Sequence, residues 1–126
     1  MQKIIIDTDI AIDFLRGLEY AKELINRLWR NGGAYLSILS VYELYAGMKE
    51  KEREDTDNFI KACDIELIDY AIARKGAELF KKYRKIGISL TTVDCLIAAS
   101  AIVKKYKIAT RNIKHYPEKD IIYTLY

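Results

Sequence analysis

The sequence predicts an α/β protein with a central, mostly parallel sheet of about five short strands, covered by helices on both faces. Short apolar segments rich in isoleucine alternate along the chain with longer segments whose apolar residues recur at helical spacing. Strands that alternate with helices indicate a parallel sheet, and strands buried on both faces are continuously hydrophobic. The 126 residues are 51% hydrophobic and include a single proline, so one domain over residues 1–126 is expected.

Each element follows from its local pattern. The predicted strands are Lys3–Ile6, Tyr35–Leu39, Ile65–Ile68, Lys107–Thr110 and Ile121–Thr124. The predicted helices are Asp9–Arg16, Glu19–Asn31, Ser40–Lys49, Glu52–Cys63, Asp69–Ile86 and Thr92–Tyr106. The second helix should end at the Gly32-Gly33 pair, because glycine commonly follows the last helical residue.

Composition narrows the functional class. The net charge of +3 permits a phosphate-bearing partner without demanding one. No apolar run is long enough to span a membrane, and the chain begins in a strand without a signal peptide, so a cytoplasmic protein without membrane contact is expected. Cys63 and Cys95 are predicted to be buried free thiols. With a single histidine and no CxxC motif, a structural zinc site is not expected.

Three acids occupy equivalent places in the predicted fold. Asp7 directly follows the first strand, Glu43 lies in the first predicted turn of the helix after the second strand, and Asp94 lies in the first turn of the last long helix. Each is an isolated acid in apolar surroundings. Ligands of parallel α/β sheets bind beyond the carboxyl ends of the strands, so these three side chains are expected to converge there.

Helix capping is the alternative explanation for these acids. Ser40-x-x-Glu43 and Thr91-x-x-Asp94 both match a capping box, and Asp7, Thr8 or Asp9 could cap the first helix. Acids in a first turn also suit the helix dipole. Capping does not explain why all three acids lie at the ligand-binding edge, or why Glu43 and Asp94 have hydrophobic neighbours. Both explanations stay open at this point.

Convergence would restrict the chemistry of the site. Like charges at close range raise one another's pKa, and a cation relieves that repulsion. Oxygen ligands favour Mg²⁺ or Mn²⁺, which makes a bound water a better nucleophile and neutralises charge on phosphorus. Such chemistry needs no histidine base, and His115 has no evident triad partner.

Four segments together resemble one family. IIIDTD near the N-terminus, SVYELYAG, TVDCLIAASA and ATRNIKHY occur in the order and spacing of PIN-domain nucleases, and the sequence is most similar to the VapC-type toxins of prokaryotic type II toxin–antitoxin systems. The resemblance covers essentially the whole chain. It implies a PIN-like three-layer α/β/α sandwich forming a single domain.

The resemblance also implies roles for particular residues. Asp7, Glu43 and Asp94 match the acids that bind the metal and carry catalysis. Asp9 and Thr110 match supporting positions, and Thr110 is expected to hydrogen-bond Asp7. The family usually has a fourth acid shortly after Thr110, but this chain has Asn112 and His115 there, so whether one or two ions bind is left open. Asn112 can still bind the metal or orient a water.

The implied activity is Mg²⁺- or Mn²⁺-dependent endoribonuclease action, with RNA phosphodiester bonds hydrolysed by a metal-activated water held by the carboxylate cluster. The implied assembly is a homodimer inhibited by a small antitoxin, which lays a segment along a groove and contacts DNA on behalf of the complex. Arg16, Arg111 and Lys114 lie near the motifs and are candidate RNA phosphate contacts.

Two other functions remain as alternatives. A catalytically weak or inactive PIN-like domain would bind RNA or protein only. A phosphatase of the haloacid-dehalogenase class would use Asp7 of the Asp7-Thr8-Asp9 motif as a covalent nucleophile, but it would leave Glu43 and Asp94 without a role. Asp13, one helical turn after Asp9, is expected on the exposed surface.

Overall fold

The computed structural model describes residues 2–125, and its centre is a four-stranded parallel sheet. The strands are β1 (Ile4–Ile6), β2 (Ala34–Ser37), β3 (Asp64–Glu66) and β4 (Lys107–Ala109). They are arranged in the order β3-β2-β1-β4, and every neighbouring pair is parallel. The central strand β1 is held in register from both sides, with Ile5 opposite Tyr35 of β2 and Ile108 of β4.

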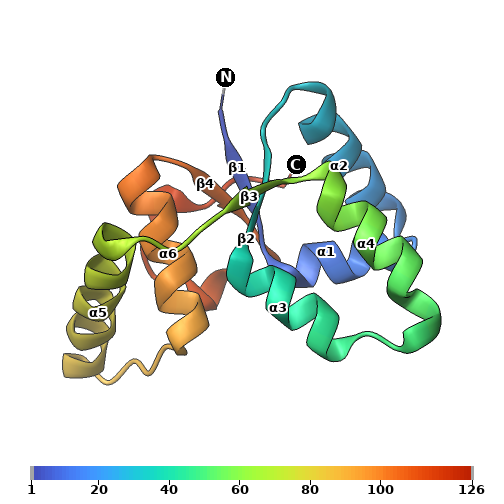
Figure 1. The fold of residues 1–126 in the computed structure, drawn as a ribbon. Coiled ribbons are helices and arrows are strands. Elements are labelled where there is room, and N and C mark those ends of the chain that lie inside the picture. The colour runs from blue at the N-terminus through green and yellow to red at the C-terminus, as the bar shows by residue number, and fades with distance from the viewer. Residues whose placement is uncertain (1, 126) are drawn as a thin grey trace.

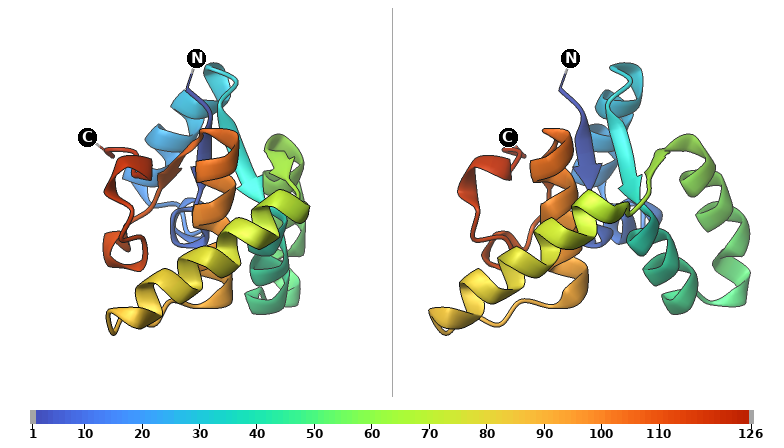
Figure 2. Two further views of the ribbon diagram at one scale, coloured as in Figure 1. Left: turned by 90° about the vertical axis from the view of Figure 1, so that its left-hand side faces the viewer. Right: turned by 60° about the vertical axis from the view of Figure 1, so that its left-hand side comes forward.

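Helices cover both faces of this sheet (Figure 1). The helices are α1 (Thr8–Leu15), α2 (Glu19–Arg30), α3 (Ile38–Gly47), α4 (Arg53–Ala62), α5 (Tyr70–Lys85) and α6 (Thr92–Lys104), with short 3₁₀ turns η1 (Glu50–Glu52), η2 (Ile113–His115) and η3 (Lys119–Ile121). Helices α1 to α4 lie on one side of the sheet and the α5–α6 pair on the other, as the turned views also show (Figure 2). The predicted three-layer α/β/α architecture is therefore confirmed.

The alternating directions of the strand side chains produce two separate cores. Ile4 and Ile6 of β1 pack into a core with residues of α1, α2 and α4, whereas Ile5 between them packs into a core with residues of α5 and α6. All three isoleucines are at most 1% exposed. The continuous isoleucine run that suggested a doubly covered strand thus follows from the period of two in a strand.

The connections place a topological switch point beside β1. The chain runs from β1 to β2 and then β3 on one side, and β4 is added on the opposite side of β1. The segments that leave the carboxyl ends of β1 and β4 therefore diverge, which opens space for a ligand between them. Asp7 and Thr110 are the residues that directly follow these two strands.

The predicted fifth strand at residues 121–124 is wrong. Lys119–Ile121 form the 3₁₀ turn η3, and only Ile122 pairs with the sheet, through an isolated parallel bridge to Ile108. Tyr123 N donates to Ile108 O over 2.9 Å. Because the helical turn occupies the start of this segment, little extended backbone is left to pair with β4, and the sheet has four strands instead of five.

The boundary between β2 and α3 also differs from the prediction. The strand ends at Ser37, which pairs with Glu66 of β3, and its side chain caps α3 by accepting a hydrogen bond from Leu39 N over 3.1 Å. Leu39 therefore belongs to the helix, and Ser40 is a buried helical residue, not the cap. Glu43 consequently lies in the second turn of α3, so the predicted capping box with Ser40 is wrong.

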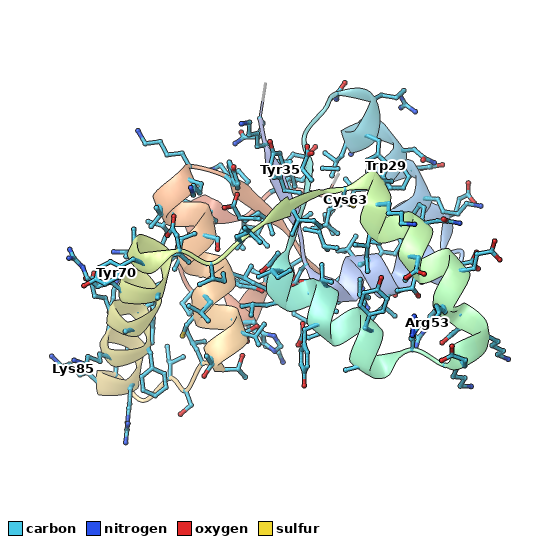
Figure 3. All side chains as sticks on the ribbon, viewed as in Figure 1. Trp29, Tyr35, Arg53, Cys63, Tyr70 and Lys85 are labelled. Atoms are coloured by element: carbon cyan, nitrogen blue, oxygen red, sulfur yellow. The ribbon has the colours of Figure 1, made fainter. Side chains whose placement is uncertain are left out.

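Other local predictions are confirmed. Helix α2 ends before Gly32, whose φ of 71° is readily adopted by glycine. A Cβ atom on Gly33 would lie 2.6 Å from the backbone oxygen of Gln2, so no side chain fits there. Cys63 and Cys95 are buried free thiols, and Figure 3 shows Cys63 and Trp29 on the side of the sheet covered by α2 and α4. No helix in the described part of the chain has the length and apolarity needed to cross a bilayer.

Candidate active site

A pocket of about 330 Å³ opens where β1, β2 and β4 end, and it is called the acid pocket below. It is lined by Asp7, Thr8, Asp9, Glu43, Thr91, Val93, Asp94, Asn112 and His115. The structure thus brings together the three acids singled out from the sequence, along with Asp9 and Asn112. The N-terminal ends of α1 and α6 also point at this pocket, and helix N-termini favour negative charge.

Asp7 lies at the base of the acid pocket. Its side chain is 8% exposed and is held by two donors, Thr8 N at 2.9 Å from Oδ1 and Thr110 Oγ1 at 2.7 Å from Oδ2. Asp7 is therefore the N-cap of α1 and a pocket residue at once. Burial, together with the charge of Asp9, raises the pKa of Asp7 to about 6, even though these two hydrogen bonds and a weaker one from the Tyr116 hydroxyl oppose the rise.

Glu43 reaches the pocket from the second turn of α3. The Thr8 hydroxyl donates to Glu43 Oε1 over 2.6 Å and also lies 2.9 Å from Ser40 Oγ. Thr8 thus joins α1 to α3 at the pocket wall, a role that the sequence analysis missed. The signal available was its position between two acids directly after a strand.

Asp94 occupies the third residue of α6, as the sequence predicted. Thr91 Oγ1 accepts a hydrogen bond from Asp94 N over 3.1 Å, so Thr91 is the N-cap. Partial burial is the main cause of a raised Asp94 pKa, and the charge of Glu43 adds to the rise. The Nδ1 atom of His115 lies 3.6 Å from Asp94 Oδ2, and the interaction with His115 opposes the rise in the Asp94 pKa.

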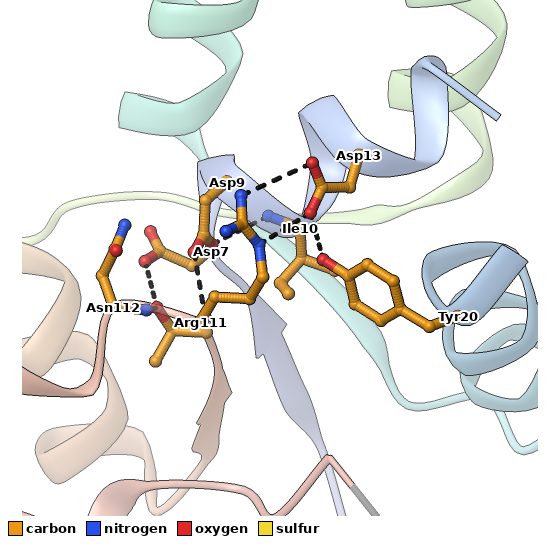
Figure 4. Close-up of polar contacts among 8 residues, drawn as sticks. Asp7, Asp9, Ile10, Asp13, Tyr20, Arg111 and Asn112 are labelled. Atoms are coloured by element: carbon orange, nitrogen blue, oxygen red, sulfur yellow. Dashed lines mark hydrogen bonds and ion pairs between the residues drawn. The ribbon is translucent and has the colours of Figure 1, made fainter. Parts of the chain in front are cut away.

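The segment after β4 is tied to α1 through backbone donors. Asp9 accepts hydrogen bonds from Ile10 N over 2.8 Å and from Arg111 N over 2.9 Å, and Thr110 Oγ1 accepts from Asn112 N over 3.0 Å (Figure 4). These contacts fix Asn112 at the pocket rim. The expected hydrogen bond from Thr110 to Asp7 is present, and Asp9 joins α1 to the segment after β4.

The three basic residues proposed to contact RNA phosphates do not line the acid pocket. Arg16 lines a neighbouring groove, and Lys114 is an exposed residue of η2. The side chain of Arg111 turns away from the acid pocket towards Asp13 (Figure 4). These positions leave the acid pocket without a lysine or arginine in its wall.

The prediction that Asp13 lies on the exposed surface is wrong. Asp13 is only 3% exposed, and its carboxylate accepts from Arg111 Nε over 2.7 Å and from the Tyr20 hydroxyl. Its neighbours on α1, in the apolar stretch Ile10-Ala11-Ile12 and Phe14-Leu15, were the signal for burial. Asp13 therefore belongs to an ion pair that anchors the segment after β4.

Tyr116 is a second residue that the sequence analysis missed. Its side chain is fully buried, and its hydroxyl makes no hydrogen bond of good geometry within the described residues. Burial raises the Tyr116 pKa, and the charges of Asp7 and Asp94, with a weak hydrogen bond to Asp7, raise it further. No periodicity in residues 109–116 singled it out.

The donor set of the acid pocket matches the oxygen ligands that Mg²⁺ and Mn²⁺ prefer. None of its three central carboxylates forms an ion pair with lysine or arginine within residues 2–125. In the same residues, no three Asp, Glu, His or Cys side chains stand close enough together to hold an ion as they are placed. Glu43 and Asp94 are only half-buried, so side-chain rotation can bring their oxygens towards Asp7.

A second groove of about 360 Å³ adjoins the acid pocket and shares Glu43 with it. It is called the helical groove below because α1, α3 and α4 form its walls. Its lining residues are Ile12, Leu15, Arg16, Glu43, Leu44, Gly47, Met48, Lys51, Glu52, Asp55 and Thr56. A ligand in this groove would therefore reach an acid of the adjoining pocket.

Comparison with known sequences gives consistent matches. The PIN domain family model matches residues 4–118. The chain is 40% identical over 114 residues to "Ribonuclease VapC19" of Mycobacterium tuberculosis, covering 90% of this chain and 91% of that protein. It is 30% identical over 115 residues to "Ribonuclease VapC1" of Methanocaldococcus jannaschii, covering 90% and 79% of the two chains.

Solved structures share the fold. A chain of VapBC2 from Rickettsia felis, bound to a DNA fragment from its promoter, superposes with a TM-score of 0.85 at 21% identity over 96% of both chains. A chain of DNA-bound VapBC from Salmonella typhimurium gives 0.84 at 20% identity, covering 97% of this chain and 96% of that one. At these identities the structural likeness concerns the arrangement of strands and helices.

Proposed function

This chain belongs to the PIN-domain family, and from that membership and the acid pocket we propose that it is a Mg²⁺- or Mn²⁺-dependent endoribonuclease that acts as the toxin of a toxin–antitoxin pair. The observation that supports the proposal best is that Asp7, Glu43 and Asp94 meet in one pocket from three separate elements without a lysine or arginine in its wall. Burial and the charge of Asp9 raise the pKa of Asp7, burial and the charge of Glu43 raise the pKa of Asp94, and carboxylates in such surroundings favour binding of a cation.

The proposed ligands of the ion are Asp7, Glu43 and Asp94. A bound Mg²⁺ or Mn²⁺ would neutralise charge that develops at the phosphorus and acidify a water for attack. Thr110 and Thr8 N fix both oxygens of Asp7, and Thr8 orients Glu43. Asp9 and Asn112 hold the rim in place, so the chain supplies the orientation on which such phosphoryl chemistry depends.

The names of the relatives support the choice of RNA as substrate, because curated proteins of 30% and 40% identity are ribonucleases. The structural neighbours come from VapBC complexes, so we propose a small antitoxin as partner and DNA contact through that antitoxin. The helical groove suits a segment of the antitoxin, because it leads to Glu43. A homodimer located in the cytoplasm completes the proposal.

Two observations favour a second function. The carboxylates do not stand at metal-binding distances as they are placed, and no acid occupies position 112 or 115. A PIN-like domain that binds RNA or protein without cleaving it would fit both facts. Family membership removes the support for a haloacid-dehalogenase phosphatase, in which Glu43 and Asp94 would have no role.

The experiment is cleavage of total RNA by the purified chain with Mn²⁺, with Mg²⁺ and with EDTA. We expect cleavage with either ion and none with EDTA. Asp7→Asn and Asp94→Asn should each reduce cleavage at least about a hundredfold, because a catalytic ion contributes several kcal/mol to the transition state. Lys81→Ala, an exposed change on α5 at a residue that does not line the pocket, should leave cleavage unchanged.

The outcomes separate the two functions. Cleavage that persists in EDTA or in both aspartate variants would contradict the metal-nuclease proposal. RNA binding without cleavage, in wild type and variants alike, would support the non-catalytic alternative.

A further inference from the structure

His115 is the one nitrogen base that the described residues place in the wall of the acid pocket. It ends the turn η2, three residues after Asn112, and its side chain is 48% exposed. The rest of the wall presents carboxylate, hydroxyl, amide and apolar groups. His115 is also the only histidine of the chain.

The position of His115 relative to Asp94 is close to that of two ligands on one ion. Adjacent ligands of an octahedral ion at about 2.1 Å lie about 3 Å apart. His115 Nδ1 and Asp94 Oδ2 are separated by 3.6 Å, so a small rotation of the exposed imidazole closes the difference. At this distance the two atoms are too far apart for a strong hydrogen bond.

A second observation concerns the fully buried hydroxyl of Tyr116, which follows His115 in the chain. Within the described residues this hydroxyl makes no hydrogen bond of good geometry, although the Asp7 carboxylate is near enough to act on it. A buried hydroxyl is unfavourable unless it is well paired, and a hydrated ion beside Asp7 would supply a partner through its water shell.

We propose that His115 binds the catalytic ion through Nδ1, so that the centre has mixed nitrogen and oxygen ligands and takes Mn²⁺ in preference to Mg²⁺. Mg²⁺ is a hard ion that demands oxygen, whereas imidazole suits transition metals. The proposal rests on the proposed metal-dependent function and narrows it to one ion and one further ligand. His115 is thus a metal ligand, not a general base.

Electron paramagnetic resonance of bound Mn²⁺ tests this ligand directly. Pulsed measurements detect a nitrogen bound to Mn²⁺, and labelling with ¹⁵N-histidine changes that signal only if the nitrogen belongs to His115, because the chain has no other histidine. We expect a directly bound histidine nitrogen in wild type. The signal should vanish in His115→Ala.

Calorimetric titration gives the matching affinities. His115→Ala should weaken Mn²⁺ binding about tenfold or more and change Mg²⁺ binding much less. His115→Asp, which offers oxygen in place of nitrogen, should shift the preference towards Mg²⁺. Lys119→Ala, an exposed change in η3, is the matched control and should change neither affinity.

The outcomes distinguish this inference from the function on which it rests. Mn²⁺ that binds and supports RNA cleavage without a nitrogen signal would overturn the role of His115 and leave the nuclease proposal standing. Equal weakening of Mg²⁺ and Mn²⁺ binding by His115→Ala would overturn the selectivity. Absence of binding by either ion to wild type would overturn both proposals.

Discussion

Two buried aspartates, Asp7 at the N-cap of α1 and Asp13 within that helix, differ in how their charge is compensated. Asp13 is 3% exposed and pairs with Arg111, with a further hydrogen bond from Tyr20. Asp7 is 8% exposed, receives hydrogen bonds from Thr8 N and the Thr110 hydroxyl, and has no ion pair with a cationic side chain within residues 2–125. The Asp7 pKa rises to about 6 as a result.

The contrast between Asp13 and Asp7 shows how one fold can hold one buried carboxylate for stability and another for ligand binding. A buried carboxylate is costly unless a cation or several donors compensate it. At Asp13 the chain supplies its own cation, and the pair ties α1 to the segment after β4. At Asp7 no cationic side chain compensates the buried charge, and like charges lie nearby. Such an arrangement favours the ion-bound protein over the ion-free protein.

The largest predicted effect concerns Asp7 and pH. Its pKa is about 6 in the folded chain and 3.8 ordinarily, so folding favours the protonated form and stability is lost as pH rises from about 4 to 6. The difference corresponds to about 3 kcal/mol above pH 6. Asp7→Asn should therefore stabilise the metal-free protein by up to about 3 kcal/mol at about pH 8.

Urea denaturation of wild type and Asp7→Asn at about pH 4 and pH 8 measures this effect. The stabilisation should shrink towards the lower pH, because at about pH 4 Asp7 is protonated in the folded chain and about half protonated in the unfolded chain. Destabilisation by Asp7→Asn at about pH 8 would show that its carboxylate is fully compensated, and the contrast with Asp13 would fail.

Addition of Mn²⁺ should offset the loss of folding stability that the ionised Asp7 causes. A ligand at about a hundred times its dissociation constant stabilises the folded state by about 2.7 kcal/mol. We expect this gain for wild type and for Asp13→Asn, and its loss in Asp7→Asn. Thermal unfolding with and without Mn²⁺ at about pH 8 measures it, and equal gains in wild type and Asp7→Asn would place the ion elsewhere.

Removal of the cation at Asp13 should have the opposite sign to the change at Asp7. Arg111→Met keeps much of the side-chain volume but leaves Asp13 buried without its partner, and the variant should lose about 1–2 kcal/mol of unfolding free energy. The value is moderate because the Arg111 side chain is 51% exposed and partly screened by solvent. A double-mutant cycle with Asp13→Asn isolates the pair, and a coupling near zero would contradict its structural role.

The smallest effect is expected at Thr110. Thr110→Val is nearly isosteric and removes the donor to Asp7 Oδ2 along with the acceptor of Asn112 N. The loss of the donor should cost about 1 kcal/mol more at about pH 8 than at pH 4 and raise the Asp7 pKa further. Carboxylate NMR titration and urea denaturation measure the two changes. A cost as large at about pH 4 as at pH 8 would show that packing, not the hydrogen bond to the ionised acid, is the cause.

Local sequence patterns were enough to predict much of the fold. The isoleucine run of β1 and the helical stripe of α2 depend on neighbours a few residues away, so their types and approximate bounds were predicted correctly. The fifth strand and the Ser40 cap failed for a different reason. Strand β2 ends at Ser37, two residues before the predicted end, where Ser37 pairs with Glu66 of β3 and caps α3. The η3 turn leaves only Ile122 to pair with β4. The strand pairings join residues far apart in the sequence, so local patterns do not predict where they stop.

The sequence by itself determined the three acids, the places of Asp7 after β1 and of Asp94 in the first turn of α6, and the resemblance to one family. Tertiary structure alone decided which charges are compensated. Asp13 and Arg111 lie 98 positions apart in the sequence, and only the fold brings them into contact. Asp7, by contrast, receives a hydrogen bond from Thr110 and lies near the like charge of Asp9. Compensation depends on distance and burial, and both are set only when the strands of the sheet come together.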